Sequence, residues 1–562
     1  MTLPKALEDL RHALAQMSFP LPSVHGEDAE EIRKDIVRQL EDYILPRYAS
    51  LDAPLIAVVG GSTGSGKSTL VNSLLHQNIA RASAIRPTTR RPLLIHNPHD
   101  AHWFNDSRVL PGLARVSGQA EGASSHNELA LAASDAVPQG LALLDSPDID
   151  SVVEENRRLA FQLLSAADLW VFVTTAARYA DAVPWAMLDE AASRDIVIAV
   201  VLDRVPIGDA PAVRSDLHAR LDERGLGSAP LFVISEGLGE DGFVPTESVE
   251  PIRGWLEGIA KDAAVRAHVA RQTLSGAVDK LLADRQFLME GANEQVAMVE
   301  RLRGDIRHSF VQAEKEIASG LADGKLLRDE VLERWQEIVG TGELMKRLES
   351  SVASVRDRIS AAFRGRGKER DFVQVEEAIE DTLLDLIVTQ AEEAIANTGA
   401  AWQQRAIAQD CLNRANVNIR SHEERYAAGA RMVRDWQREL LDMISDEGQS
   451  KRATAKVLSW SVNALGAALM IVIFASTSGL TGGEVAVAGG TALLAERVLE
   501  AVFGDDAVRR MSAKARESFL ARTREFLNAD EAPFDAALDE VGDVELWRDA
   551  LAVAFERAIE EK

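Results

Sequence analysis

Four residues in the first part of the sequence, Gly61, Gly66, Lys67 and Ser68, have the types and the spacing of a phosphate-binding loop. In such a loop successive backbone N–H groups wrap a phosphate, and glycine permits the close approach that this requires. The lysine ammonium reaches the β- and γ-phosphates of a nucleotide and takes part in their chemistry, and the serine hydroxyl holds Mg²⁺. We therefore expect the whole loop to bind a nucleotide. It consists of Gly61, Ser62, Thr63, Gly64, Ser65, Gly66, Lys67, Ser68 and Thr69.

The residues on either side supply the elements that must position this loop. Residues 56–59 are a short apolar run typical of a buried strand. After the loop, Leu70, Val71, Leu74 and Leu75 have the spacing of an amphipathic helix. The order strand, glycine-rich turn, helix distinguishes a phosphate-binding loop from a chance match. The N-terminus of the helix would add its partial positive charge to the phosphate site.

Magnesium and the third phosphate of a nucleotide require further side chains. Asp145 ends an apolar run, where a carboxylate can bind Mg²⁺ through water. Thr88 or Thr89 could close on Mg²⁺ and the γ-phosphate, as threonines on mobile loops do in GTPases. Arg86 and Arg90 flank these threonines and are candidates for stabilising the charge of the transferred phosphate. The alternative is that both are ordinary surface arginines.

The stretch around the loop alternates apolar runs with helical segments. Nearly continuous Val, Ile and Leu runs of this kind indicate the buried strands of a largely parallel sheet. The sequence therefore predicts an α/β nucleotide-binding domain with a mostly parallel sheet. Its apolar runs begin at Ile56, Leu93, Leu141, Leu169, Ile196 and Pro230.

A long region without proline follows the predicted sheet. No proline occurs between Pro251 and Pro533, and the region is rich in Ala, Leu, Glu and Arg, which favours long helices. Apolar residues recur at helical spacing from Leu274 to Ile317 and again from Ile379 to Ile395. Because stripes of this length pack against one another, we expect an elongated antiparallel bundle.

An uncharged apolar segment lies within this region. Val457–Ser476 has the length that a membrane-spanning helix requires. Lys451, Arg452 and Lys456 precede it, and more basic residues follow the apolar stretch, which suits a hairpin whose two ends face anionic lipid. The alternative is a hairpin buried inside the helical domain, which Asn463 and the many small residues allow.

The composition narrows the function classes. The chain has 562 residues and a formal net charge of -26, which argues against a general nucleic-acid binder. Its single cysteine, Cys411, excludes an intramolecular disulfide and a cysteine-based zinc site. The first residues lack the hydrophobic core of a signal peptide. We therefore expect a cytoplasmic protein with no nucleic-acid partner.

In its motifs the sequence resembles the dynamin family of large GTPases, and most closely the bacterial dynamin-like members. The resemblance lies in VVGG-x-x-x-x-GKS at the loop, in TRRPL from Thr89, in DSPDID from Asp145, and in the run IVIAVVLDRVP, which contains Asp203. The matching motifs extend over about Leu55–Val205. Beyond them only the architecture is similar.

The resemblance implies a GTPase that uses GTP, GDP and Mg²⁺. It makes Lys67 and Ser68 the phosphate and magnesium residues, Thr89 the switch threonine that also faces the metal, and Asp145 the magnesium-linked aspartate. In the family, nucleotide domains pair and complete each other's sites, and a helical region with a membrane-binding tip follows. We therefore expect a homodimer or homo-oligomer, or a pair with a paralogous dynamin-like protein, on anionic lipids at the inner face of the cell membrane.

Two motifs depart from the family pattern. Asp148 stands where the pattern D-x-x-G has a glycine whose backbone N–H contacts the γ-phosphate. The guanine motif [NT]-K-x-D becomes D-R-V-P from Asp203, without the final aspartate. We expect Asp203 and Arg204 to contact the base, with Ser235 as the second base-contacting position.

The predicted fold class is an α/β P-loop GTPase domain with a mostly parallel sheet, plus a long all-α bundle or stalk with a hydrophobic membrane-binding hairpin. The expected boundaries are 1–50 for N-terminal helices that pack on the stalk or on the GTPase domain, 51–258 for the GTPase domain, 259–450 for the bundle, 451–505 for the hairpin at the membrane-interacting tip, and 506–562 for C-terminal helices that return to the bundle.

Three functions remain open from the sequence. The leading hypothesis is a mechanochemical GTPase in which pairing of the nucleotide domains moves a helical stalk at a membrane. A P-loop small-molecule kinase is an alternative because GGSTGSGKST also resembles nucleoside kinases, although a kinase needs neither stalk nor hairpin. A nucleotide-gated membrane scaffold with little turnover is consistent with the altered motifs at Asp148 and Asp203.

Overall fold

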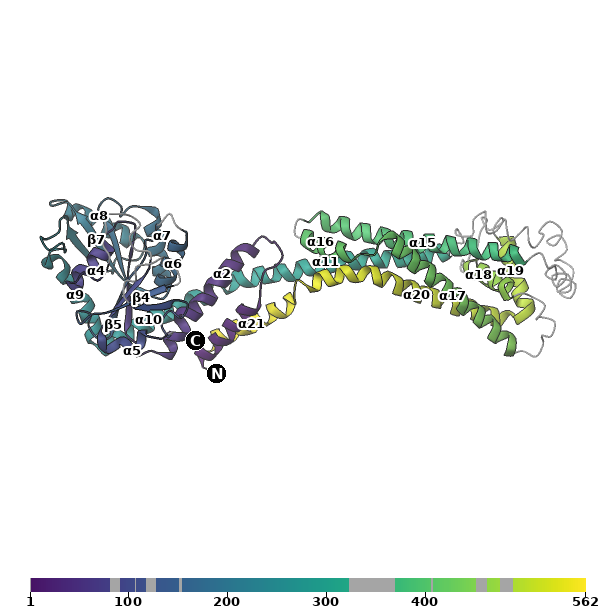
Figure 1. Cartoon of the computed structure of the whole chain (residues 1–562), viewed down its shortest axis with the longest axis horizontal. Coiled ribbons are helices and arrows are strands. Elements are labelled where there is room, and N and C mark those ends of the chain that lie inside the picture. Colours follow the sequence, from purple (N-terminus) through teal and green to yellow (C-terminus); the bar gives the residue numbers. More distant parts are fainter. Residues whose placement is uncertain are drawn as a thin grey trace. The chain divides into compact units, whose positions relative to one another are not determined.

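The computed structural model divides the chain into two compact units (Figure 1). Unit 1 contains Met1–Phe19, Ser23–Glu294 and Val544–Lys562, and unit 2 contains Pro20–Pro22 and Gln295–Asp543. The structure describes residues 2–80, 91–106, 108–117, 128–150, 154–322, 369–405, 408–450, 462–475 and 489–562.

A single sheet organises unit 1. Its eight strands lie in the order β3-β4-β2-β5-β1-β6-β7-β8. Every described strand pair is parallel except β2 with β5, so the sheet is mostly parallel, as predicted. The strands are β1 (Leu55–Gly61), β2 (Leu93–His96), β3 (Ala114–Ser117), β4 (Glu128–Ala133), β5 (Leu141–Asp145), β6 (Leu169–Thr175), β7 (Val197–Val205) and β8 (Leu231–Ser235).

Six of these strands coincide with the six apolar runs of the sequence, and two were missed. The missed strand β3 has the sequence ARVS, in which Val116 is the only strongly apolar residue. Strand β4 has the sequence ELALAA, whose alanines have little strand preference, and it is buried only in part. Both lie beyond β2, on the side of the sheet that runs opposite to β1.

Helices cover both faces of this sheet. In β1 the side chains of Leu55, Ala57 and Val59 join one apolar cluster, and those of Ile56 and Val58 join a second cluster on the other face. The helices of unit 1 are α1 (Leu3–Gln16), α2 (Gly26–Gln39), η1 (Leu40–Ile44), α3 (Leu45–Ala49), α4 (Lys67–Leu75), η2 (Pro98–Asp100), α5 (Ala101–Phe104), α6 (Glu154–Ser165), α7 (Ala182–Ser193), α8 (Ala210–Glu223), α9 (Thr246–Lys261), α10 (Ala263–Ala283) and α21 (Val544–Glu560).

The two ends of the chain meet in unit 1. Helix α1 packs along α21, and Leu7 and Leu10 of α1 share one apolar cluster with Leu551 and Phe555 of α21. Helix α21 therefore lies in unit 1, whereas the sequence-based boundaries assign residues 506–562 to the bundle. Helix α21 belongs to unit 1 because its apolar side chains are buried against α1.

A buried ionic cluster connects the N-terminal helices to the strand that leads into the phosphate-binding loop. The Asp168 carboxylate accepts hydrogen bonds from the Ile56 N–H of β1 (2.8 Å) and from the Tyr43 hydroxyl (3.1 Å). It also forms an ion pair with Arg47 at 3.1 Å. The side chains of Asp168 and Arg47 are 1% and 7% exposed, so each charge depends on the other.

Asp168→Ala should lower the free energy of unfolding by about 3–5 kcal/mol, because it leaves the Arg47 guanidinium buried without a counter-charge. Urea denaturation measures this difference. The control Asp52→Ala removes an exposed carboxylate and should change stability by less than about 0.5 kcal/mol. Equal effects of the two substitutions would contradict the structural role of the cluster.

Unit 2 is a helical bundle. The predicted apolar stripes are buried in it: Leu302, Ile306 and Phe310 in α11, and Ile379, Leu383 and Ile387 in α15. The stripe predicted from Leu274 is interrupted where α10 ends at Ala283. The described helices are α11 (Arg285–Ala322), which begins in unit 1, and α15 (Glu369–Gln403), α16 (Gln409–Asn418), α17 (His422–Ser450), α18 (Val462–Ala475), α19 (Gly489–Phe503) and α20 (Asp505–Asp539).

Residues 462–475 of the apolar segment form α18, which lies inside this bundle. Residues 465–473 are all buried, and α18 packs against α15, α17, α19 and α20. In this structure residues 465–473 are therefore covered by protein. None of the helices in the described ranges is long and apolar enough to cross a membrane. Lys451, Arg452 and Lys456 lie outside the described residues.

Candidate nucleotide-binding site

The glycine-rich loop connects β1 to α4 at the carboxyl edge of the sheet. Gly61 lies where the loop leaves β1, and a Cβ atom there would be 2.0 Å from the Val173 carbonyl oxygen of β6. Gly66 precedes α4 with a φ of 95°, in the left-handed region, and a Cβ atom there would be 2.3 Å from the Asp203 carboxylate. Any other residue at either position would displace the loop.

Lys67 is buried within the loop and is fully engaged there. Its ammonium donates hydrogen bonds to the carbonyl oxygens of Gly61 (2.9 Å) and Ser62 (3.0 Å) and to the Asp148 carboxylate (2.6 Å). An ammonium has three N–H donors, so these contacts use all of them. A phosphate that binds Lys67 must therefore replace one of these three acceptors. Asp148 is the only anion among the three, so it is the acceptor that a phosphate would replace.

Ser68 and Asp145 form the second pair of the site. The Ser68 hydroxyl donates a hydrogen bond of 2.7 Å to Oδ2 of Asp145, at the end of β5. The other carboxylate oxygen, Oδ1, is buried and has no hydrogen-bond partner among the described residues. A hydroxyl and a carboxylate with an unsatisfied oxygen are the hard oxygen ligands that Mg²⁺ prefers. These residues fit the metal that the sequence analysis assigned to them.

The pKa of Asp145 is raised to about 6, chiefly because burial disfavours the carboxylate. The hydrogen bond from Ser68 and the charge of Lys67 oppose this shift, and Asp148 adds to it. Since the pKa in the unfolded chain is near the ordinary 3.8, Asp145 stabilises the fold fully below that value, and this contribution is lost as the pH rises through about 6.

Asp145→Asn should therefore stabilise the nucleotide-free protein more at about pH 7.5 than at about pH 5, because the amide is neutral at both. The measurement is the melting temperature of the variant and of the wild-type protein across this pH range, without Mg²⁺. A difference in melting temperature that does not change with pH would contradict the raised pKa of Asp145.

Sequence reasoning missed a second ionic contact at the loop. The Asp150 carboxylate accepts hydrogen bonds from the backbone N–H (2.5 Å) and the hydroxyl (2.8 Å) of Thr63. It also forms an ion pair of 2.6 Å with Arg178. Burial raises the pKa of Asp150, but the contacts with Thr63 and Arg178 outweigh this and hold the pKa below its ordinary value. Asp150 lies in the motif DSPDID, but nothing in the sequence marks Arg178.

The expected base-contacting residues lie at the ends of two neighbouring strands. Asp203 and Arg204 are near the end of β7 and Ser235 ends β8. The Asp203 carboxylate lies over Gly66, and burial raises its pKa. Ser235 is exposed, and the backbone N–H of Glu236 donates to the Val205 carbonyl (2.9 Å), which joins the two strand ends. The other expected residues, Arg86, Thr88, Thr89 and Arg90, lie outside the described residues.

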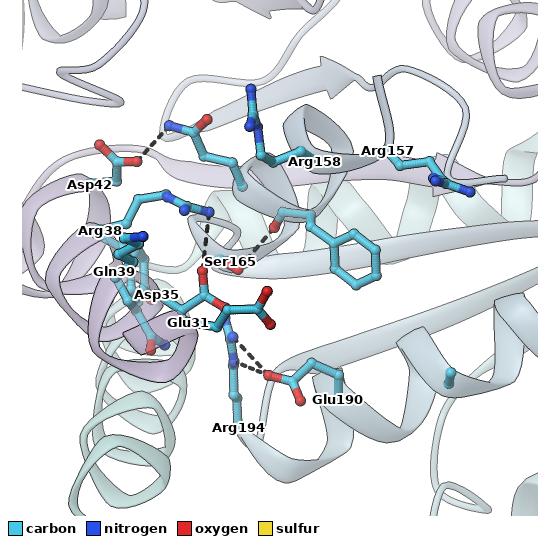
Figure 2. Close-up of a pocket in the computed structure, with 15 residues that line it drawn as sticks. Glu31, Asp35, Arg38, Gln39, Asp42, Arg157, Arg158, Ser165, Glu190 and Arg194 are labelled. Carbon is cyan, nitrogen blue, oxygen red and sulfur yellow. Dashed lines mark hydrogen bonds and ion pairs between the residues drawn. The ribbon is translucent and has the colours of Figure 1, made fainter. Parts of the chain in front are cut away.

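A polar pocket of about 750 Å³ lies elsewhere in unit 1, between α2, α6 and α7 (Figure 2). Its charges are of both signs and partly neutralise one another, as in the ion pairs of Arg38 with Asp35 and of Arg194 with Glu190. None of the predicted nucleotide-site residues lines it. This pocket is therefore separate from the predicted nucleotide site.

The strand, glycine-rich loop and helix, with Lys67 engaged in the loop and Ser68 paired with Asp145, define the protein as a P-loop nucleoside-triphosphate-binding protein. Residues 56–203 match the family model described as the dynamin family. The resemblance found in the sequence is thus confirmed over residues 56–203, which are similar to the nucleotide domain of the dynamin family.

Other comparisons place the chain beside solved structures only distantly. It is similar to a chain of an oligomerised bacterial dynamin pair, described as providing a mechanism for long-range sensing and tethering of membranes, with 11% identity and a TM-score of 0.45 over 100% of this chain and 95% of that chain. It is also similar to Toc33 from Arabidopsis thaliana in complex with Mg²⁺ and GMPPNP, with 14% identity and a TM-score of 0.23 over 46% of this chain and 97% of that chain. No curated protein matches the sequence.

Proposed function

We propose that the protein hydrolyses GTP to GDP and phosphate with Mg²⁺, and that nucleotide-dependent pairing of its GTPase domains is coupled to membrane binding, remodelling or scaffolding at the inner face of the cell membrane. The observation that supports hydrolysis is the arrangement of Lys67, Ser68 and Asp145 inside a domain of the dynamin family. The family binds guanine nucleotides, and Asp203, Arg204 and Ser235 are the residues proposed to contact the base.

In this proposal the chain positions the phosphates and provides no general base, as is usual in phosphoryl transfer. The ion pair of Lys67 with Asp148 is replaced by contacts of Lys67 with the β- and γ-phosphates. Ser68 and Asp145 hold Mg²⁺, which neutralises phosphate charge when it is bound. Thr89 is proposed to close on the metal and the γ-phosphate, and Arg86 and Arg90 to stabilise the charge of the transferred group.

The membrane part of the proposal depends on the apolar segment. Because α18 is buried in unit 2, contact with lipid requires α18 to separate from α15, α17 and α20. The test is flotation with vesicles of anionic phospholipid, with and without a non-hydrolysable GTP analogue. Ile471→Asp should abolish binding to the vesicles if α18 is the contact. A variant that unfolds instead would favour α18 as a permanent core helix.

The first test of the enzymatic proposal is phosphate release from GTP and from ATP over a range of protein concentrations. We expect release from GTP, with a rate per molecule that rises with concentration because paired domains complete each other's sites. Turnover of ATP alone would contradict guanine selectivity. Binding of GTP without turnover would instead favour a nucleotide-gated scaffold, which the engagement of Lys67 by Asp148 also supports.

A further inference from the structure

The Asp150 carboxylate lies where an anion can bind to the phosphate-binding loop. It is bound by a backbone N–H and a hydroxyl of Thr63 and by the guanidinium of Arg178. Backbone N–H groups of such a loop are the groups that bind phosphate oxygens. The three donors that bind the Asp150 carboxylate can therefore bind a phosphate group at the same position.

Arg178 is held beside the loop by the sheet. It belongs to the turn that follows β6, and β6 is paired with β1 up to Gly61, the first residue of the loop. Its guanidinium donates to the Thr63 carbonyl (3.2 Å) and forms ion pairs with Asp150 and Asp181. The side chain is 39% exposed, so the cation sits at the open edge of the loop.

We propose that Arg178 is a second cation of the triphosphate site, and that the terminal phosphate of the nucleotide takes the place of the Asp150 carboxylate. The inference rests on the proposed GTPase function and adds to it a charge-stabilising residue from the same chain. In the nucleotide-free protein, the carboxylates of Asp148 and Asp150 neutralise Lys67 and Arg178. In the nucleotide complex, phosphate oxygens take over both cations.

The chemical role follows from where charge accumulates during hydrolysis. The water oxygen forms a bond to the γ-phosphorus, the bond from that phosphorus to the bridging oxygen breaks, and its electron pair remains on GDP. One water proton passes to the phosphate product or to solvent, and Arg178 keeps its own proton. Its planar fork donates two N–H groups to phosphoryl oxygens, whereas an ammonium acts as a point charge. Donors held at this place stabilise the transition state more than the bound substrate.

The experiment compares Arg178→Ala, Arg178→Lys and Asp150→Asn in the full chain, with GDP, GMPPNP and GTP as probes. We expect Arg178→Ala to lower GTP turnover on the order of 10²–10³-fold and to weaken GMPPNP binding while GDP binding is retained. Arg178→Lys should be intermediate. Asp150→Asn should tighten GMPPNP binding, because it removes the competing anion but keeps the shape of the side chain.

The control is Arg108→Ala, which removes a similarly exposed arginine (45%) that is paired with Asp106 in the same unit. It should leave turnover and both affinities unchanged. Retained GDP binding and an unchanged melting temperature show that the Arg178 variants are folded.

Two results would overturn the inference while the GTPase function stands. In the first, Arg178→Ala behaves like the wild-type protein. In the second, Arg178→Ala and Asp150→Asn lose the same activity, which means that Arg178 acts only by fixing the loop through Asp150. A wild-type protein that neither binds nor hydrolyses GTP would overturn both proposals.

A mixing experiment tests that Arg178 acts within its own chain. Lys67→Ala protein, which should not bind nucleotide, is added in excess to Arg178→Ala protein. Pairing of the two variants is measured in the same mixture, and if Arg178 serves its own site, turnover stays low although they pair. Recovered turnover would show that Arg178 serves the site of a paired copy and would overturn the assignment within one chain.

Discussion

Lys67→Ala should abolish detectable GTP binding, with a loss of affinity on the order of 10²-fold or more, because two or more charge-assisted contacts to phosphate disappear. The loss has a second cause. Without Lys67, the Asp148 carboxylate remains in the phosphate site with no counter-charge and repels the nucleotide. Titration with a fluorescent GTP analogue measures the affinity.

The control for this variant is Lys261→Ala, which removes an exposed lysine of α9 that pairs only with Glu257 among the described residues. It should bind GTP as the wild-type protein does. Because Lys67 is buried and paired, the melting temperature of Lys67→Ala has to be measured beside its affinity. A folded Lys67→Ala protein with wild-type affinity would exclude this loop as the phosphate site.

Asp148→Asn should have the opposite effect and tighten nucleotide binding by about 10- to 100-fold. The carboxylate lies 2.6 Å from Lys67 Nζ, so an incoming phosphate must displace it and is repelled by it. Two unit charges about 4 Å apart interact by about 4 kcal/mol at an effective dielectric constant of about 20, which sets an upper limit on the gain. The asparagine keeps the shape of the side chain and removes this repulsion.

The same substitution should lower the melting temperature of the nucleotide-free protein, because Lys67 loses its buried counter-charge. GTP should then raise the melting temperature of Asp148→Asn by more than it raises that of the wild-type protein. The control Asp222→Asn removes an exposed carboxylate (57%) and should change neither quantity. Weaker nucleotide binding by Asp148→Asn would mean that Asp148 helps to bind the nucleotide or its metal.

The parts of the site that lie close together in the sequence were predictable. The loop from Gly61 to Ser68 and the carboxylate at the end of β5 depend on local patterns and on the rule that parallel strands present their carboxyl ends at one edge. The contact between Arg178 and Thr63 was not predictable, because 115 positions separate the two residues. The ion pair of Asp148 with Lys67 was missed. The departure from the glycine of the family motif shows that a backbone contact to the γ-phosphate is lost, but it does not show what the new carboxylate binds.

Hydrophobicity alone left two places for the apolar segment, because lipid and a protein core are both apolar. In the structure α18 lies among three long helices, and its residues 465–473 are buried there. The reverse direction of β2 was also hidden, since an apolar run has the same composition in a parallel and in an antiparallel pair.

The meeting of α1 with α21 has a consequence for how the protein is made. Residues 544–562 leave the ribosome after all of unit 2, so α1 cannot pack against α21 until unit 2 has been synthesised. The side of α1 that packs against α21 remains uncovered until then, and a nascent chain with exposed apolar surface is a natural substrate for a chaperone. A shortened chain made for study of the nucleotide site alone should therefore keep residues 544–562, joined by a linker to Glu294, where unit 1 ends.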